Sequence, residues 1–178
     1  MKVLLHSCCG PCASACVPRL KDAGNEVVMF YSNSNIDTRE EFERRLCATR
    51  RLAEADGVSI VVDEYDHDGW VREVADGFEN EPERGRRCDR CYRYNLRRTA
   101  EYAAENGFDA FTTSLTVSPH KPSAKIFAAS GDGRFLREDF KKKDGFRLSV
   151  KRAAELCLYR QSYCGCEFSK AHIDGARR

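Results

Sequence analysis

The cysteines of this chain are gathered into three close groups, and this spacing constrains its fold more than any other feature. Ten cysteines occur in 178 residues. The three groups are Cys8, Cys9 and Cys12, then Cys88 and Cys91, and finally Cys164 and Cys166. A metal or a redox disulfide needs thiolates delivered to one point, whereas a lone cysteine is usually a small buried hydrophobe. Three groups far apart in the sequence therefore predict one folded site built from several loops.

Length and composition indicate one domain, residues 1–178. The hydrophobic fraction of 42% permits a core, and the net charge of only +2 excludes a chain that attracts nucleic acid over its whole surface. No stretch is long enough to cross a bilayer, and the first residues lack the apolar run of a signal peptide. We therefore expect a cytoplasmic protein without a membrane partner, in which grouped cysteines are metal ligands or catalytic thiols.

Apolar runs alternate with helical patterns along the chain. Strands are expected at 2–6, 26–32, 58–62 and 108–113. Helices are expected at 11–21, from a capping box at Thr38 to about Asp56, and at 70–75, 91–106, 123–129 and 149–159. This alternation predicts a single-domain α/β fold with a parallel sheet in an α/β/α arrangement, which resembles the HUP and PP-loop architecture. Because ligands gather at the carboxyl ends of such strands, cysteine-rich loops there are expected to bring Cys8, Asn33 and Ser114 together.

The first cysteine group follows the first predicted strand and opens a helix. Exposed amides and the positive end of the helix dipole lower the pKa of a thiol there, which favours metal ligation. Gly10 and Pro11 permit the sharp bend that two adjacent cysteines need to bind one cluster. The alternative is a pair of buried core cysteines.

Cys88 and Cys91 form a CxxC motif in what the sequence predicts to be a polar, arginine-rich loop. The motif alone is ambiguous between zinc, iron–sulfur and thioredoxin-like chemistry, but no second motif at zinc-ribbon or zinc-finger spacing accompanies it. Together with Cys8 and Cys9, these two thiols would complete a four-cysteine set for a 4Fe–4S cluster.

Only Gly165 separates Cys164 from Cys166. A disulfide across one residue closes a small, strained ring, and strained disulfides are labile rather than structural. The alternative is that both thiols bind the same metal. Cys16, Cys47 and Cys157 lie within predicted helices and are expected to be buried or partly buried thiols.

Basic residues crowd around the CxxC motif, and a second basic run follows later in the chain. A charge run is usually only a solvated face, but this one surrounds the expected site and therefore predicts contacts with a phosphate backbone. The candidate RNA-binding residues are Arg86, Arg87, Arg90, Lys141, Lys142 and Lys143.

Six motifs together resemble the QueH family of epoxyqueuosine reductases over nearly the whole chain. They are His6–Cys12, Tyr31–Ile36, Arg87–Tyr92, Thr113–Pro119, Asp139–Lys142 and Tyr159–Cys166. One departure is visible: Ser34 stands where the family usually has proline, which bears on the rigidity of that loop and not on the metal site.

The resemblance implies the last step of queuosine synthesis, in which an epoxide on the wobble base of a tRNA is reduced to an alkene with loss of water. It implies a 4Fe–4S cluster on Cys8, Cys9, Cys88 and Cys91, and a redox-active disulfide between Cys164 and Cys166. An additional iron ion beside the cluster is suspected in the family, and Cys12 with an acidic residue is its candidate ligand set here.

The reaction needs two electrons, two protons and stabilisation of charge on oxygen. A dithiol delivers two electrons in one step, and iron with an open position acts as a Lewis acid. Asp89, Asp139 and Tyr163 are the candidate proton donors, and the sequence does not choose among them. The electron donor that restores the dithiol is an unidentified partner.

Two other classes compete with this interpretation. A tRNA thiolase of the PP-loop type also combines a parallel sheet with iron–sulfur chemistry, but its ATP-binding loop would replace the segment from Cys8 to Cys12. A non-catalytic zinc-binding RNA module would leave the pair Cys164 and Cys166 without a purpose. Metal analysis separates the zinc module from the other two classes, and ATP hydrolysis separates those two from each other.

Overall fold

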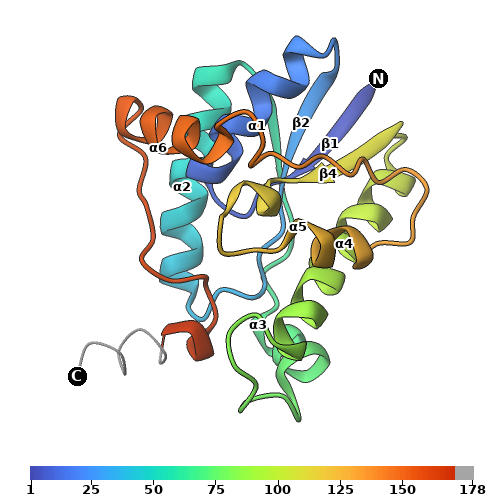
Figure 1. Cartoon of the computed structure of the whole chain (residues 1–178), viewed down its shortest axis with the longest axis vertical. Coiled ribbons are helices and arrows are strands. Elements are labelled where there is room, and N and C mark those ends of the chain that lie inside the picture. The colour runs from blue at the N-terminus through green and yellow to red at the C-terminus, as the bar shows by residue number, and fades with distance from the viewer. Residues whose placement is uncertain (171–178) are drawn as a thin grey trace.

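A parallel sheet lies at the centre of the molecule, between two layers of helices (Figure 1). The computed structural model describes residues 1–170. In that part of the chain the strands are β1 (Lys2–His6), β2 (Glu26–Tyr31), β3 (Ser59–Val62) and β4 (Ala110–Thr113), in the order β3-β2-β1-β4. All three strand pairings are parallel. The predicted single-domain α/β/α fold is therefore confirmed.

Helices cover both faces of the sheet. The longer ones are α1 (Gly10–Asp22), α2 (Arg39–Asp56), α4 (Arg86–Glu105) and α6 (Gly145–Glu155). The shorter ones are α3 (His67–Trp70), the π-helical η1 (Val71–Ala75), the 3-10 helix η2 (Ser114–Val117) and α5 (Ser123–Ala128). The predicted start of α2 is confirmed, because Thr38 Oγ1 accepts a hydrogen bond of 3.2 Å from the backbone N–H of Glu41.

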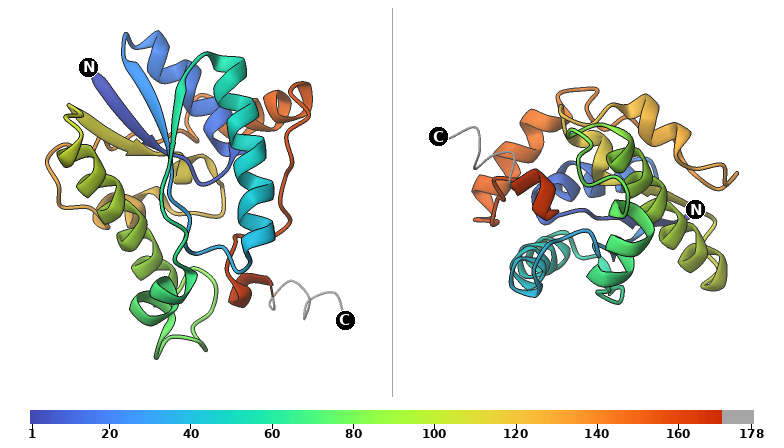
Figure 2. Two further views of the ribbon diagram at one scale, coloured as in Figure 1. Left: turned by 180° about the vertical axis from the view of Figure 1, so that it is seen from behind. Right: turned by 90° about the horizontal axis from the view of Figure 1, so that it is seen from below.

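Alternate residues of the strands enter two separate cores. Val3 and Leu5 of β1 pack with α1, α2 and α6, whereas Leu4 between them packs with α4 and α5 on the other face. Figure 2 shows the two helical layers from behind and from below. A parallel sheet that is buried on both faces explains why β1 and β2 are nearly continuous apolar runs.

The strand order creates a crevice at the carboxyl ends of β1 and β4. The chain adds β2 and β3 on one side of β1 and then returns to place β4 on the other side, and ligands bind where such an order reverses. The backbone N–H of Cys8 donates to Ser114 Oγ at 3.0 Å, and Asn33 Nδ2 donates to the carbonyl of Ser7 at 3.0 Å. The predicted convergence of these loops is confirmed.

Helices α4 and α6 differ most from the predicted helix boundaries. Helix α4 begins at Arg86, five residues before the expected start at 91, so the CxxC motif lies in the first two turns of a helix and its assignment to a loop was wrong. The reason is a contact with the preceding loop: the Arg87 guanidinium donates to three backbone carbonyls of residues 78–81 and anchors that loop against the helix. Helix α6 spans Gly145–Glu155 and not 149–159, and it ends there because Cys157 adopts a left-handed φ of 50°.

The segment after α6 returns along α2 towards the carboxyl edge of the sheet, as both Figure 1 and Figure 2 show in orange and red. The Tyr159 hydroxyl donates to the Glu41 carboxylate of α2 at 3.1 Å, which fixes this path. The segment thereby carries Cys164 to the crevice. Among residues 1–170, no helix combines the length and the apolar character that a membrane span requires.

Candidate metal and redox site

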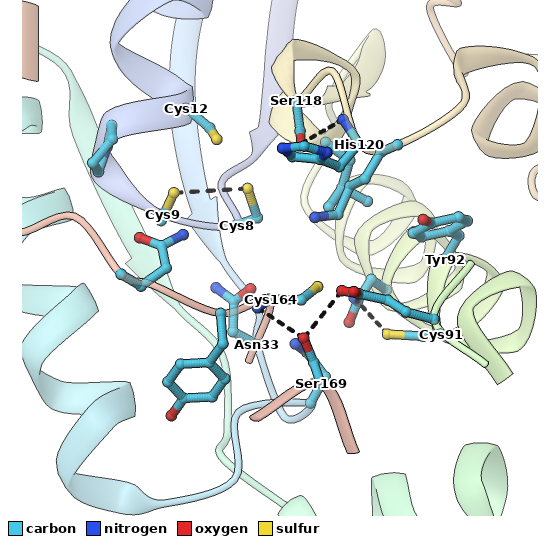
Figure 3. Close-up of a pocket in the computed structure, with 18 of the residues that line it drawn as sticks. Cys8, Cys9, Cys12, Asn33, Cys91, Tyr92, Ser118, His120, Cys164 and Ser169 are labelled. Atoms are coloured by element: carbon cyan, nitrogen blue, oxygen red, sulfur yellow. Dashed lines mark hydrogen bonds between the residues drawn. The ribbon is translucent and has the colours of Figure 1, made fainter. Parts of the chain in front are cut away.

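Three thiols meet at the start of α1 and form a set of ligands that fits a metal ion. We call Cys8, Cys9 and Cys12 the thiol triad. Their three sulfur atoms all lie within 4.8 Å of one another, and the Sγ atoms of Cys8 and Cys9 are 4.0 Å apart (Figure 3). Gly10 makes this turn possible, because a Cβ there would come within 2.8 Å of the carbonyl oxygen of Ala48 on α2.

Hydrogen bonds within the triad and the start of helix α1 both favour negative charge on Cys9. Cys9 is the N-cap of α1, where unpaired N–H groups and the helix dipole favour negative charge. Hydrogen bonds from Cys12 and then from Cys8 hold the pKa of Cys9 well below that of an ordinary thiol. Ser114 also donates to Cys8 Sγ at 3.3 Å. The site therefore stabilises a thiolate, the form of cysteine that binds metals.

His6 supports the triad from behind. It is completely buried; Nε2 donates to the carbonyl of Ser32 at 3.1 Å, so Nδ1 accepts from Thr113 Oγ1 at 2.8 Å. Burial lowers the pKa of this imidazole to about 4, so the ring is neutral. His6 thus ties together the ends of β1, β2 and β4 and has no access to a ligand.

A second pair of thiols faces the triad from α4. We call Cys88 and Cys91 the α4 pair. Cys91 lines the same cavity as the triad, about 440 Å³ in volume, and both members of the pair line a smaller adjoining cavity of about 40 Å³. Burial raises the pKa of both thiols. The α4 pair therefore lies across the cavity from the triad and outside the tight group of three sulfurs.

The third pair reaches the cavities from the C-terminal segment. We call Cys164 and Cys166 the C-terminal pair. Cys164 lines both cavities and Cys166 the smaller one, and Figure 3 shows Cys164 between the triad and Cys91. All ten cysteines carry free thiols in this structure. The structure thus brings all three predicted cysteine groups to one pair of adjoining cavities.

A buried arginine of α2 holds the C-terminal pair in place. The side chain of Arg45 is 1% exposed. Its Nη1 donates to the carbonyl of Cys164 at 2.8 Å, its Nη2 to the carbonyl of Tyr163 at 3.3 Å, and its Nε to Glu41 at 2.7 Å. The guanidinium therefore links a buried carboxylate to the backbone of the C-terminal pair.

Gly165 is required by both conformation and space. Its φ of +151° is one that residues with a side chain rarely adopt, and a Cβ there would lie 2.9 Å from Asn35 Nδ2. Its carbonyl accepts a hydrogen bond of 2.9 Å from the backbone N–H of Asp37. In the sequence this glycine is only the single residue between the two cysteines, whereas the structure uses it for a close approach to the loop after β2.

Sequence reasoning missed a lysine inside the site. Lys121 lines both cavities together with Cys8 and Cys164. Although burial acts to lower the pKa of Lys121, negative charge on Cys164 and Cys8 raises it well above its ordinary value. Lys121 follows η2, beyond the carboxyl end of β4. Because ligands gather at the carboxyl ends of parallel strands, this position could have marked Lys121 as a candidate site residue.

The three candidate proton donors lie in different places. Tyr163 lines the large cavity, and its hydroxyl donates to Asp37 at 2.6 Å. Asp89 pairs with Lys125 at 3.0 Å, and Asp139 lies 3.7 Å from Lys141. Neither aspartate lines either cavity, which argues against both as direct proton donors.

The predicted RNA-binding residues divide into two kinds. Arg87 and Arg90 donate to backbone carbonyls within residues 73–81. Lys141 Nζ donates to two backbone carbonyls and one hydroxyl, those of Thr116, Lys121 and Ser123. These three side chains hold the protein together. Arg86 is exposed although it pairs with Glu81, and Lys142 and Lys143 are exposed. The last three remain open to a phosphate backbone.

The cysteines outside the three groups agree only in part with the prediction. Cys16 is fully buried in α1, as expected. Cys47 and Cys157 are exposed, so their assignment as buried or partly buried thiols was wrong. Cys47 lies on the outer face of α2, and Cys157 lies in the turn that ends α6. Neither position faces the sheet, so both thiols are exposed.

Sequence comparison leads to the same family as the motifs. The family model of epoxyqueuosine reductase QueH matches residues 3–172. The chain is 36% identical to an epoxyqueuosine reductase QueH of Streptococcus pyogenes, covering 94% of this chain and 69% of the relative. It is 36% identical to the QueH of Acinetobacter baylyi and 31% identical to that of Thermotoga maritima, covering 94% of this chain in both cases and 80% and 89% of the relatives. With this match over nearly its whole length and a thiol site at the sheet edge, the chain belongs to the QueH family of epoxyqueuosine reductases, which are oxidoreductases.

Proposed function

We propose that this protein reduces epoxyqueuosine to queuosine at the wobble position of tRNA, using an iron–sulfur cluster and the C-terminal pair. The observation that carries the proposal is the cavity itself: thiols from three distant segments line one volume large enough for a nucleoside. Membership of the QueH family supplies the substrate class and the reaction.

The donor atoms fit an iron–sulfur cluster. Cys8 and Cys9 of the triad and the α4 pair would hold a 4Fe–4S cluster, and Cys12 is then available to an additional iron ion. A set made only of thiols is typical of iron–sulfur and zinc sites and excludes hard cations such as Mg²⁺. When bound, iron supplies electron transfer and Lewis-acid activation of oxygen.

The C-terminal pair supplies the electrons of the net reaction. Two thiols become a disulfide and release two electrons and two protons. The epoxide takes up both, so its two C–O bonds break, an alkene forms and the oxygen leaves as water. A second reductant, the unidentified electron donor, must then return the disulfide to two thiols.

Tyr163 is the proton donor that the geometry favours among the three candidates, because it alone lines the cavity. Burial first, and then the hydrogen bond to Asp37, raise the pKa of its hydroxyl, so the group keeps its proton at neutral pH. A hydroxyl that stays protonated can donate to an oxygen that develops negative charge.

The tRNA backbone would meet exposed basic residues, two of which line the cavity. Arg84 and Arg160 line the cavity and are exposed, and Arg86, Lys142 and Lys143 are the predicted RNA-binding residues that remain exposed. Phosphate contacts of this kind make affinity fall as salt rises. Removal of Arg84 and Arg160 should flatten the salt dependence of tRNA binding, whereas Lys141→Ala should loosen the loop that it anchors.

The decisive experiment is turnover by anaerobically isolated protein. Iron, sulfide and zinc are quantified, and the protein is then incubated with tRNA carrying epoxyqueuosine and a reductant while queuosine is measured by mass spectrometry. We expect iron and sulfide without stoichiometric zinc, and formation of queuosine. Cys166→Ala should keep the metal and lose turnover, and Cys47→Ala, which removes an exposed thiol outside the cavities, is its matched control.

Protein with a full cluster that forms no queuosine would contradict the proposed reaction. Zinc in place of iron would point to a binding module instead. Loss of iron from Cys166→Ala would make the C-terminal pair ligands rather than a redox couple.

A further inference from the structure

Two buried asparagines line the large cavity, and the amide oxygen of each lacks a hydrogen-bond partner among residues 1–170. Asn95 of α4 is 3% exposed, and Asn35 in the loop after β2 is 8% exposed. Within residues 1–170, the Oδ1 atom of each makes no hydrogen bond. Buried polar atoms are nearly always paired, because an unpaired one loses its water without replacement. Two such acceptors in one cavity indicate a ligand that donates hydrogen bonds to them.

The neighbours of the two amides show which part of a ligand reaches them. Asn95 Nδ2 donates to Cys91 Sγ at 3.7 Å, so this amide lies against the α4 pair. Asn35 Nδ2 lies 2.9 Å from the position of a Cβ on Gly165, so the other amide lies against the C-terminal pair. Both acceptors therefore flank the thiols that would carry the chemistry, and the group that donates to them belongs to the reacting end of the substrate.

The reacting end of epoxyqueuosine is a cyclopentane ring that carries hydroxyl groups beside the epoxide. We infer that Asn35 and Asn95 bind these hydroxyls and hold the ring against Cys164. This inference rests on the proposed function and adds to it a determinant of specificity. A nucleoside without the hydroxylated ring leaves both acceptors unpaired, and a site built to accept hydrogen bonds rejects such an analogue strongly.

The test compares two RNA hairpins that differ only in the reacting ring. Both are anticodon stem-loops; one carries queuosine at the wobble position, and the other carries the aminomethyl-deazaguanine base that lacks the hydroxylated ring. Their Kd values are measured on the anaerobically isolated protein with its cluster. Because the RNA backbone is the same, phosphate contacts cancel in the ratio of the two values.

We expect wild type to prefer the queuosine hairpin by about a hundredfold, since two hydrogen bonds at about tenfold each distinguish the ligands. Asn95→Leu and Asn35→Ser should each reduce the preference by about tenfold, and Asn95→Asp, which keeps an acceptor oxygen, should retain it. Asn25→Ala is the matched control, because the Asn25 amide donates to the carbonyl of Leu20 outside the cavity. Melting curves check folding, and Asn95→Ser replaces Asn95→Leu if that variant does not fold.

Equal Kd values for the two hairpins on wild type, or an unchanged preference in folded variants at both positions, overturn the inference. An equal loss of affinity for both hairpins also overturns it, because the amides would then bind the shared base or backbone. Absence of turnover in wild type, with a preference that still depends on the two asparagines, overturns the proposed reaction and not this ligand assignment.

Discussion

The thiol triad and the C-terminal pair face one cavity but are held in different ways. The triad lies between a strand and a helix of the central fold, in front of the fully buried residues His6 and Ser7. The C-terminal pair lies in an irregular segment, and a few hydrogen bonds to other residues hold its backbone. Its anchors are Arg45 and Asp37 on one side and Ser169 on the other.

This difference fits the two tasks that we propose. Metal ligands must keep one geometry, and attachment to a buried sheet fixes it. A redox pair alternates between two thiols and a bond, so its backbone must adjust as the sulfur atoms approach and separate. Segments held by a few polar contacts open and rearrange more easily than core elements.

The largest expected effect is loss of the metal from triad variants. Cys8→Ala or Cys9→Ala removes one of the proposed cluster ligands at the end of β1 and leaves the thiol triad with two sulfurs. Anaerobically isolated variants should therefore lack stoichiometric iron and sulfide and their visible absorption. Cys47→Ala serves as the control. A full complement of iron in both triad variants would show that the sheet edge is not the metal site.

Arg45→Met should produce the next largest effect, because it breaks the anchor of the C-terminal pair. Removal of one partner of a buried ion pair costs about 3 kcal/mol of folding free energy, since the remaining charge, here Glu41, stays buried. Turnover should fall with the loosened segment, while iron content stays unchanged. Denaturant unfolding, metal analysis and turnover are measured together.

Arg44→Met is the matched control for Arg45→Met. Arg44 lies on the same helix, but its side chain is 51% exposed; it pairs with the exposed Glu40 at 2.9 Å and approaches the buried Glu41 only to 3.8 Å. Its removal should cost less than about 1 kcal/mol. Equal effects of the two variants would mean that Arg45 acts only on the stability of α2. Loss of iron in Arg45→Met would mean that the two regions are not independently held.

The difference between the triad and the C-terminal pair also explains which parts of the site the sequence could predict. The triad site follows from local patterns: an apolar run gives β1, Pro11 starts a helix, and parallel strands bring Cys8 beside Ser114. The C-terminal pair could be recognised by its motif, but no local pattern shows that Arg45 of α2 holds it. Such a contact depends on tertiary packing between residues that are 119 positions apart.

Charged residues were the least predictable part of the site. Arg87 and Lys141 looked like surface charges in the sequence, yet both bind backbone carbonyls inside the protein. Lys121 belongs to none of the motifs and still lines the cavity. A long cationic side chain can reach solvent, a carbonyl or a ligand from the same backbone position, so only the fold decides its role.

The protonation of Cys166 should also distinguish the two regions. Burial raises the pKa of this thiol to about 11, in contrast to the lowered pKa of Cys9 in the triad. A raised pKa keeps the proton on sulfur until the pH approaches 11, so alkylation at neutral pH should be about a hundredfold slower than for a thiol of pKa 9.0. The rate should rise about tenfold per pH unit towards that value.

Iodoacetamide labelling of Cys164→Ser, followed by peptide mass spectrometry, measures this rate for Cys166 alone. Glutathione labelled in the same tube provides the unperturbed reference. Rapid labelling of Cys166 at pH 7 would show that the C-terminal pair does not stay buried in solution. The C-terminal pair would then differ from the thiol triad in its mobility and not in the pKa of its thiols.

Tyr163→Phe should have the smallest effect on folding and the most informative effect on turnover. The change deletes one hydrogen bond to Asp37, which still accepts from Lys170 at 3.2 Å, so the free energy of unfolding should fall by about 1 kcal/mol.

Tyr65→Phe is the matched control: it deletes a hydrogen bond of 2.7 Å to the carbonyl of Ile36 in the same loop, and Tyr65 does not line either cavity. If Tyr163 donates a proton to the substrate, its variant loses turnover by about a hundredfold while the control does not. Similar turnover in the two variants would limit Tyr163 to holding the C-terminal pair, and the proton would then come from another group that lines the cavity.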